Sequence, residues 1–169
     1  MQSQRISINA KDGGQFGAYL SLPPTGKGPG ILLIQEIFGV NQHIREVADQ
    51  YASDGFVVLA PDVFWRQEAG VDIGYDDAGF KKGFGLMQGM DFPKAVEDLC
   101  AAANALKARP EVIGKVASLG FCMGGMLSYL VGTTPGAVDA SICYYGGGIH
   151  TALDRAPQAK IPMLMHFAE

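Results

Sequence analysis

The stretch from Val116 to Leu130 places the strongest constraint on how this 169-residue chain folds. An apolar run typical of a strand leads into Gly120-Phe-Cys-Met-Gly124, and an apolar run typical of a helix follows at once. This order has the form of a nucleophile elbow, G-x-Nu-x-G, with cysteine where serine is commoner. Such a turn needs a strained backbone, and glycine two residues away on either side removes side-chain collisions. We therefore predict a strand–turn–helix unit that presents Cys122 above a sheet.

The chemistry of Cys122 follows from its expected place at the start of a helix. A helix N-terminus favours the thiolate, which is the nucleophilic form of cysteine. The alternative is a buried structural cysteine, because free cysteine packs as a small hydrophobe and glycine-rich turns follow many strands. We expect Cys100 and Cys143 to be core thiols of that kind. An odd count of three cysteines without a C-x-x-C spacing predicts no disulfide framework, no metal site and no cofactor.

Composition limits the class of protein and the partners it can have. Hydrophobic residues make up 48% and charged residues 18%, which predicts a single globular domain over residues 1–169. A net charge of −4 gives no basic surface for nucleic acid. No apolar run approaches the ~20 residues of a membrane helix, and the N-terminus has no secretory signal pattern. We therefore expect a cytoplasmic protein without nucleic-acid or membrane partners.

The order of apolar runs predicts an α/β fold. Residues 3–9 and 15–22 alternate as two antiparallel strands joined by a turn at Lys11–Gly14. Buried strands are predicted near 31–34, 56–60, 116–120, 140–145 and 161–167, and helices over 42–54 and from 92 to Pro110. Strand–helix–strand order implies right-handed crossovers and a parallel sheet. The predicted architecture is α/β-hydrolase-like, a mostly parallel sheet with helices on both faces and an antiparallel N-terminal start.

Residues 62–91 interrupt this pattern with a segment rich in glycine and aspartate. We predict an irregular insertion above the sheet that either lines a pocket or is mobile. Trp65 is expected at the rim of that pocket or over the core.

Candidate site residues follow the strands whose carboxyl ends meet at one edge of the sheet. In this architecture the oxyanion hole takes one N–H from the residue after the nucleophile and one from the loop after the third strand. Those residues are Met123 and Ile37, and each such donor contributes about 3 kcal/mol in acyl transfer. Glu36 precedes Ile37, so its carboxylate is expected near the sulfur, where it accepts or holds the thiol proton. The alternative for Glu36 is a solvated carboxylate that caps the next helix.

Four segments resemble the dienelactone hydrolase (carboxymethylenebutenolidase) family. They are Gln-Glu-Ile-Phe-Gly-Val-Asn at 35–41, Ala-Pro-Asp at 60–62, Gly-Phe-Cys-Met-Gly-Gly at 120–125 and Tyr-Tyr-Gly at 144–146. The resemblance covers almost the whole chain, in order and with similar spacing. That family has the α/β-hydrolase fold and hydrolyses enol-lactones with a Cys-His-Asp triad.

The resemblance assigns roles to the site residues. Cys122 is implied to be the nucleophile, and Glu36 the carboxylate that holds the thiol until substrate displaces it. Ile37 and Met123 are implied to donate the oxyanion hydrogen bonds. Tyr145 and Phe38 are implied to line the substrate pocket. The implied partner is a small ester or lactone, and the full-length protein is expected to be a monomer.

The chain departs from the family pattern in its histidines. In this fold the triad acid and histidine follow strands later than the elbow. His43 is expected at a helix start, His150 in a loop and His166 within a strand, so none of the three fits. We therefore expect a single domain truncated after the strand near 161–167, without the triad acid and base. Such a chain would bind an acyl substrate but turn it over poorly.

A second departure concerns the arginines with which the family holds a substrate carboxylate. The segment that matches one of them, residues 78–84, contains lysines but no arginine. Lys81 is the expected substitute, as a point charge without the bidentate fork. The alternative is that Lys81 and Lys82 are solvated. Specificity for a carboxylate-bearing lactone is therefore left open.

Two other functional hypotheses fit the elbow. Cys122 with a nearby glutamate also occurs in amidotransferase-like folds and in redox-sensing flavodoxin-type folds, where the cysteine oxidises to sulfenic acid. Those folds lack the antiparallel strands predicted over 3–22. The third hypothesis is a non-catalytic fragment that only binds, or that pairs an exposed sheet edge with another chain.

Overall fold

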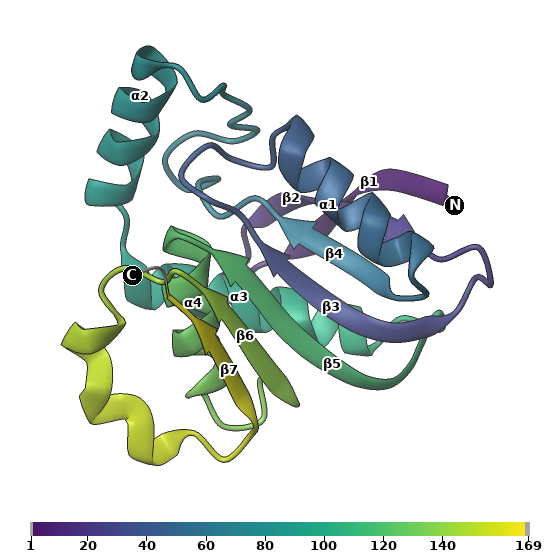
Figure 1. Ribbon diagram of the computed structural model, residues 1–169. Helices are drawn as coiled ribbons and strands as arrows, with labels where there is room; N and C mark the ends of the chain where they lie inside the picture. Colours follow the sequence, from purple (N-terminus) through teal and green to yellow (C-terminus); the bar gives the residue numbers. More distant parts are fainter. Residues whose placement is uncertain (1, 168–169) are drawn as a thin grey trace.

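The computed structural model describes residues 2–167 and contains one seven-stranded sheet (Figure 1). The strands are β1 (Gln2–Asn9), β2 (Gln15–Leu22), β3 (Gly28–Ile34), β4 (Val57–Pro61), β5 (Val112–Phe121), β6 (Ala140–Tyr144) and β7 (Met163–His166). Their order across the sheet is β1-β2-β4-β3-β5-β6-β7. The first two pairings, β1 with β2 and β2 with β4, are antiparallel, and the other four are parallel. The predicted fold class is confirmed.

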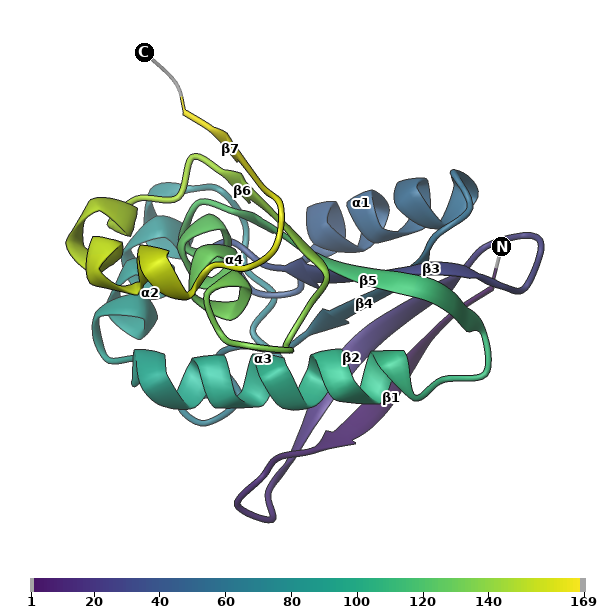
Figure 2. The ribbon, with the colours of Figure 1, turned by 90° about the horizontal axis from the view of Figure 1, so that it is seen from below.

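Helices cover both faces of this sheet. They are α1 (Gln42–Ser53), α2 (Asp77–Gln88), α3 (Phe92–Lys107), α4 (Met123–Gly132) and the 3₁₀ helix η1 (Ile149–Gln158). Figure 2 shows α1 on one side of the sheet and α3 with α4 on the other. Along β3 the buried side chains alternate: Ile31 and Leu33 join the core under α1, whereas Leu32 and Ile34 join the core under α3 and α4. A continuous apolar run is therefore the pattern of a strand buried on both faces.

Two predictions for the connecting segments are wrong. Residues 62–91 are not irregular throughout, because they contain α2, whose first turn is capped by the Asp76 side chain accepting from the Gly79 N–H (2.7 Å). Three glycines inside α2 lower its intrinsic helix propensity, and the sequence pattern therefore did not predict this helix. The link around His150 is not a loop, because it forms the 3₁₀ helix η1.

The last strand, β7, lies at one edge of the sheet and pairs with β6. Beside it, a mostly apolar groove of about 380 Å³ opens on the α1 face, with Ile142, Tyr144 and Leu164 among its lining residues. An exposed edge of this kind was expected from the sequence. Pairing of that edge with another chain stays a prediction.

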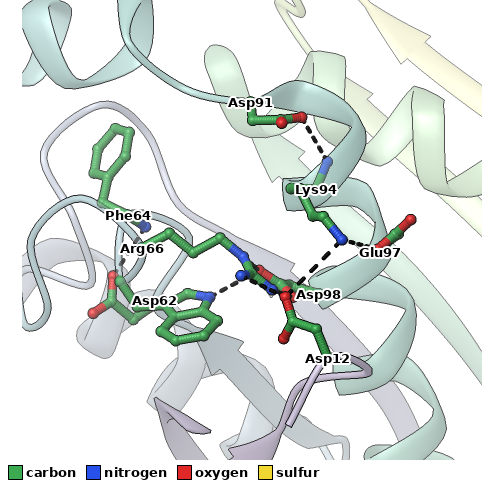
Figure 3. A network of polar contacts seen from close by, with 9 residues as sticks. Asp12, Asp62, Phe64, Arg66, Asp91, Lys94, Glu97 and Asp98 are labelled. Carbon is green, nitrogen blue, oxygen red and sulfur yellow. Dashed lines mark hydrogen bonds and ion pairs between the residues drawn. The ribbon is translucent and has the colours of Figure 1, made fainter. Parts of the chain in front are cut away.

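A polar network ties the N-terminal hairpin to α3 through the segment after β4 (Figure 3). Asp98 of α3 accepts from Arg66 Nε (2.7 Å), Arg66 Nη2 (2.8 Å) and Trp65 Nε1 (2.8 Å). Arg66 Nη1 also donates to Asp12 in the hairpin turn (2.8 Å). Trp65 stacks on Phe16 and packs against the core, so it covers the core. Asp98 is buried, so its three hydrogen bonds compensate for the loss of hydration.

We predict that Asp98→Asn lowers the free energy of unfolding by about 2 kcal/mol, because charge-assisted hydrogen bonds to Arg66 are lost. Urea denaturation measures the difference. Glu97→Gln is the matched control on the same helix, since Glu97 forms an exposed ion pair with Lys94 (2.9 Å). Its expected change is about 0.5 kcal/mol or less. Equal losses in the two variants would contradict the assignment.

Candidate active site

Two adjacent strands end in residues with strained backbone conformations. Cys122, between β5 and α4, has φ 55° and ψ −120°, and Tyr145, after β6, has φ 40°. Within residues 2–167 these are the two non-glycine residues with positive φ. The Cys122 N–H donates to the Tyr144 carbonyl (3.0 Å), and the Tyr145 N–H donates to the His166 carbonyl (2.6 Å). Hydrogen bonds to neighbouring strands thus hold both turns, and such strain clusters at functional sites.

The glycines around Cys122 allow backbone segments to approach closely. A Cβ on Gly120 would overlap the Gly124 carbonyl, and a Cβ on Gly124 would overlap the carbonyls of Ile34 and Gln35. A Cβ on Gly125 would in turn overlap the Tyr144 carbonyl. The expected role of Gly120 and Gly124 is confirmed. The start of α4 is therefore wedged between the ends of β3 and β6.

The Cys122 thiol is half-buried, and burial raises its pKa above the ordinary value for cysteine. The neighbouring Met123 N–H lowers the pKa, whereas the negative charge of Glu36 raises it further. The N–H at the start of α4 does favour the thiolate, as predicted, but loss of hydration outweighs it, so the net effect raises the pKa of Cys122. At neutral pH Cys122 therefore rests as the thiol.

Glu36 lies half-buried in the loop after β3, and Tyr75 donates to its Oε2 (2.9 Å). Its loop is anchored by the buried Gln35 side chain. Gln35 Oε1 accepts from the Val63 N–H (3.1 Å), and its Nε2 donates to the Glu36 carbonyl (3.3 Å). Glu36 does not cap α1, because the Asn41 side chain does so by accepting from the Ile44 N–H.

Two buried backbone N–H groups at this site lack an oxygen or nitrogen acceptor. Ile37 and Met123 are 4% and 3% exposed. In the part of the chain that the structure describes, no oxygen or nitrogen accepts from either N–H group. The Met123 N–H interacts with the Cys122 sulfur, which is a weak acceptor. Both N–H groups therefore remain available to a stronger acceptor, such as an oxygen atom of a bound molecule.

Aromatic side chains surround these groups. Phe38 packs against Tyr75, with 4.3 Å between ring centroids, and Tyr145 lies half-exposed beside Phe121. Burial raises the pKa of Tyr145, and the charges of Glu36 and Cys122 raise it further. The negative charge of Glu36 therefore acts on both Cys122 and Tyr145.

Tyr75 is a site residue that the sequence reasoning missed. It comes from the segment between β4 and α2 and reaches Glu36 across 39 residues of chain. Burial raises the pKa of its hydroxyl, and the hydrogen bond to Glu36 acts in the same direction. A protonated Tyr75 is therefore a stable donor to the carboxylate. No local sequence pattern predicts this role for Tyr75, because its contact with Glu36 depends on how the segment between β4 and α2 folds over the sheet.

Lys81 lies on α2, and no hydrogen bond or ion pair within residues 2–167 joins it to Glu36. Gly83 of α2 packs against the Ile37 carbonyl, and Lys81 precedes Gly83 by two residues, about 160° around the helix. Lys81 is exposed, and Lys82 forms an ion pair with Glu68 (2.6 Å). The geometry gives Lys81 no contact with Glu36 or Cys122, and its role in substrate binding stays a prediction.

The three histidines lie on α1, η1 and β7. His43 is the second residue of α1, with its ring edge toward Tyr75, and His166 in β7 stacks on Tyr144 (4.7 Å). His150 is exposed on η1. Among the described residues, no group of three His, Cys, Asp or Glu side chains could hold a metal ion. The helices of residues 2–167 include none that is long and apolar enough to cross a membrane.

Comparison with known proteins identifies the relationship. The model of the dienelactone hydrolase family matches residues 16–169. The chain belongs to the dienelactone hydrolase family. It is 38% identical to a carboxymethylenebutenolidase from Pseudomonas sp. strain P51, over 98% of this chain and 70% of that relative. It is 36% identical to the carboxymethylenebutenolidase from Pseudomonas putida, with the same coverage.

Solved structures agree on the fold of this family member. A Klebsiella pneumoniae protein assigned as a dienelactone hydrolase superposes with a TM-score of 0.78 at 24% identity, covering 98% of this chain and 72% of that one. A dienelactone hydrolase-like promiscuous phosphotriesterase from metagenomic libraries superposes with a TM-score of 0.67 at 21% identity, covering 99% and 82%.

We predict that Gly124→Ala lowers the free energy of unfolding by about 3 kcal/mol, because the added methyl group overlaps two carbonyl oxygens of the loop after β3. Gly85→Ala is the control, since α2 leaves open space at that position. It should raise the free energy by about 0.5–1 kcal/mol through higher helix propensity. Thermal and urea unfolding measure both, and a neutral Gly124→Ala would contradict the close packing described for the turn.

Proposed function

We propose that this chain hydrolyses a carboxylic ester or lactone through Cys122 as nucleophile, with the N–H groups of Ile37 and Met123 as the oxyanion hole. The observation that carries the proposal is the pair of backbone N–H groups without an oxygen or nitrogen acceptor in residues 2–167, beside a strained, glycine-flanked cysteine. Preorganised donors of this kind stabilise the oxygen of a tetrahedral intermediate. Membership of the dienelactone hydrolase family supports the same reaction class.

Glu36 is assigned the first proton transfer. Glu36 is the charged side chain that acts on the pKa of Cys122, so it is the available acceptor for the thiol proton. The Sγ–H proton passes to the carboxylate as the sulfur bonds to the carbonyl carbon. The carbonyl oxygen then carries the negative charge and accepts from the N–H groups of Ile37 and Met123.

Collapse of this intermediate breaks the bond to the alcohol oxygen, which takes the proton from Glu36. The product is a thioester on Cys122. Water then attacks the thioester carbon, the thiol leaves protonated, and the acid is released; a lactone gives a hydroxy acid by the same two steps. For the water step the family resemblance implies a histidine and an aspartate placed after the strand near 161–167, which stays a prediction.

Tyr75 is assigned a positioning role in this scheme. Its hydroxyl occupies one carboxylate oxygen of Glu36, which leaves the other oxygen for the thiol. Phe38 and Tyr145 are assigned to the wall of the substrate pocket.

We expect this chain to form a thioester on Cys122 in the presence of an activated ester such as 4-nitrophenyl hexanoate. Intact-mass spectrometry detects the added acyl group, and peptide mapping locates it. Cys122→Ala should abolish the adduct, whereas Cys100→Ser should retain it. An adduct of equal yield in Cys122→Ala, or none in the unaltered chain, would contradict the assignment.

We predict opposite effects of Glu36→Gln on two reactions of Cys122. The negative charge of Glu36 raises the pKa of the thiol, so its removal lowers that pKa and increases the thiolate fraction at pH 8. Alkylation of Cys122 by iodoacetamide should therefore become faster, with its pH profile moved to lower pH. Acylation by the ester should slow by about 10²–10⁴-fold, because the proton acceptor is lost.

The control for this pair of measurements is Glu46→Gln, which removes one exposed charge from α1 outside the described site. It should leave both rates near those of the unaltered chain. Slower alkylation in Glu36→Gln would show that Glu36 activates the resting thiol, and it would contradict the expected fall in the thiol pKa.

A further inference from the structure

We propose that the start of α1 is a clamp that holds Tyr75 against Glu36. Its two members, Asn41 and Arg45, are positioning residues for the reaction of Cys122. This inference rests on the function proposed above and goes beyond it, because it adds residues of α1 to the machinery. The observation that carries it is a set of hydrogen bonds by which these two side chains join the Glu36 loop to the segment that leads to Tyr75.

The clamp lies where two segments run side by side. One is the loop after β3, which carries Glu36, and the other is the segment between β4 and α2. Gly39 of the first forms an antiparallel bridge with Asp72 of the second. The Ile73 N–H donates to the Phe38 carbonyl (3.1 Å). The backbones are therefore paired just before the chain reaches Tyr75.

The Arg45 guanidinium binds both segments at once. Its Nη1 donates to the Val40 carbonyl at the end of the Glu36 loop (2.6 Å) and to Oδ2 of Asp72 (2.7 Å). The side chains of Arg45 and Asp72 are 24% and 44% exposed, and ion pairs with this much exposure add little to stability. We therefore expect Arg45 to fix the distance between the two segments with little effect on the free energy of unfolding.

Asn41 joins the same two segments from the N-cap of α1. Its Oδ1 accepts from the Ile44 N–H (3.1 Å), and its Nδ2 donates to the Ile73 carbonyl (3.3 Å). An N-cap needs only the oxygen, which serine or aspartate supplies as well. The amide donor is what asparagine adds, and its partner lies two residues before Tyr75. Asn41 is buried, so loss of this donor leaves a carbonyl with poor access to water.

Tyr75 depends on such support because it is exposed. Its side chain is 57% exposed, and it meets the Glu36 loop through its hydroxyl on Glu36 Oε2 (2.9 Å) and its ring on Phe38 (4.3 Å between centroids). Exposed connecting segments are ordinarily mobile, so the ties just before Tyr75 determine where its hydroxyl lies. A proton acceptor must be held within hydrogen-bond reach of its proton, and small displacements slow the transfer. In residues 2–167 neither Asn41 nor Arg45 has a hydrogen bond to Glu36, so both act through Tyr75 and the loop.

The test measures acylation of Cys122 by 4-nitrophenyl hexanoate in variants of the full chain. Stopped flow follows release of 4-nitrophenolate in the first turnover, and intact-mass spectrometry verifies the thioester. Arg45→Met keeps a long side chain and removes both hydrogen bonds, so we expect acylation to slow by about tenfold or more. Arg45→Lys keeps a donor and a positive charge without the fork, and it should recover part of that loss.

Arg109→Met is the matched control. The Arg109 side chain is also 24% exposed, and it pairs with Glu111 (2.8 Å) just before β5. Its acylation rate should stay within about twofold of the unaltered chain, because an exposed ion pair elsewhere contributes little. Asn41→Ser tests the second member of the clamp, since it keeps an N-cap oxygen and removes the amide donor. We expect it to slow acylation by about tenfold as well.

Two measurements separate positioning from general loosening. Tyr75→Phe removes the hydroxyl through which the clamp acts, so the double variant Arg45→Met/Tyr75→Phe should react no more slowly than Tyr75→Phe alone. Alkylation of Cys122 by iodoacetamide needs no proton acceptor, and in Arg45→Met it should stay within about threefold of the unaltered chain. A loosened site would expose the half-buried thiol and speed alkylation further.

The outcomes separate this inference from the proposed function. An unchanged rate in Arg45→Met or Asn41→Ser, or an equal loss in Arg109→Met, would overturn the inference and leave Cys122 as nucleophile. Faster alkylation in Arg45→Met, or losses that multiply when Tyr75→Phe is added, would overturn it too. If the unaltered chain forms no thioester, the proposed function fails and this inference fails with it. Should Arg45→Met not fold, Asn41→Ser and its double variant with Tyr75→Phe decide the question.

Discussion

The close approach of three backbone segments at the start of α4 is the constraint on which the rest of the site depends. Gly124 lies against the carbonyls of Ile34 and Gln35, and Gly125 lies against that of Tyr144. A side chain at either glycine would push the helix away from the sheet. Since Glu36 and Ile37 follow Gln35 directly, the contact that demands glycine also brings their loop to Cys122. One packing requirement therefore brings together Cys122, the Glu36 loop and the N–H groups of Ile37 and Met123.

Burial then decides which chemistry the assembled cysteine supports. A redox-sensing cysteine needs an accessible thiolate, because the thiolate is the form that peroxide oxidises. Cys122 has a raised pKa, and the adjacent carboxylate raises it further. A protonated resting thiol suits a nucleophile that is activated by proton transfer to Glu36 when an ester is bound. The antiparallel strands β1 and β2 are present as well, so the redox and amidotransferase hypotheses lose the support of both fold and electrostatics.

The sequence predicted those features that depend on local pattern. Apolar periodicity located the strands and α3, and the glycine spacing located the strained turn, because each follows from steric rules within a few residues. The sequence did not predict α2, because its glycines weaken the helical pattern. At least one of them, Gly83, is needed for close packing against the Ile37 carbonyl. The sequence also missed Tyr75, because the direction of a side chain on an inserted segment depends on how that segment docks. The sign of the Cys122 pKa shift was missed for a related reason: burial is a tertiary property.

The division of labour between these parts has a physical consequence. The turn at Cys122 and the loop at Glu36 are locked by backbone contacts that tolerate no added side chain. In contrast, α2 meets the Glu36 loop through Gly83 and the segment after β4 through one ion pair and one side-chain hydrogen bond, and its Phe80 flank is open to solvent. A substitution on that exposed flank leaves the backbone contacts around Cys122 intact, because none of those contacts involves a side chain of α2. The surface of α2 and the strained turn can therefore vary independently.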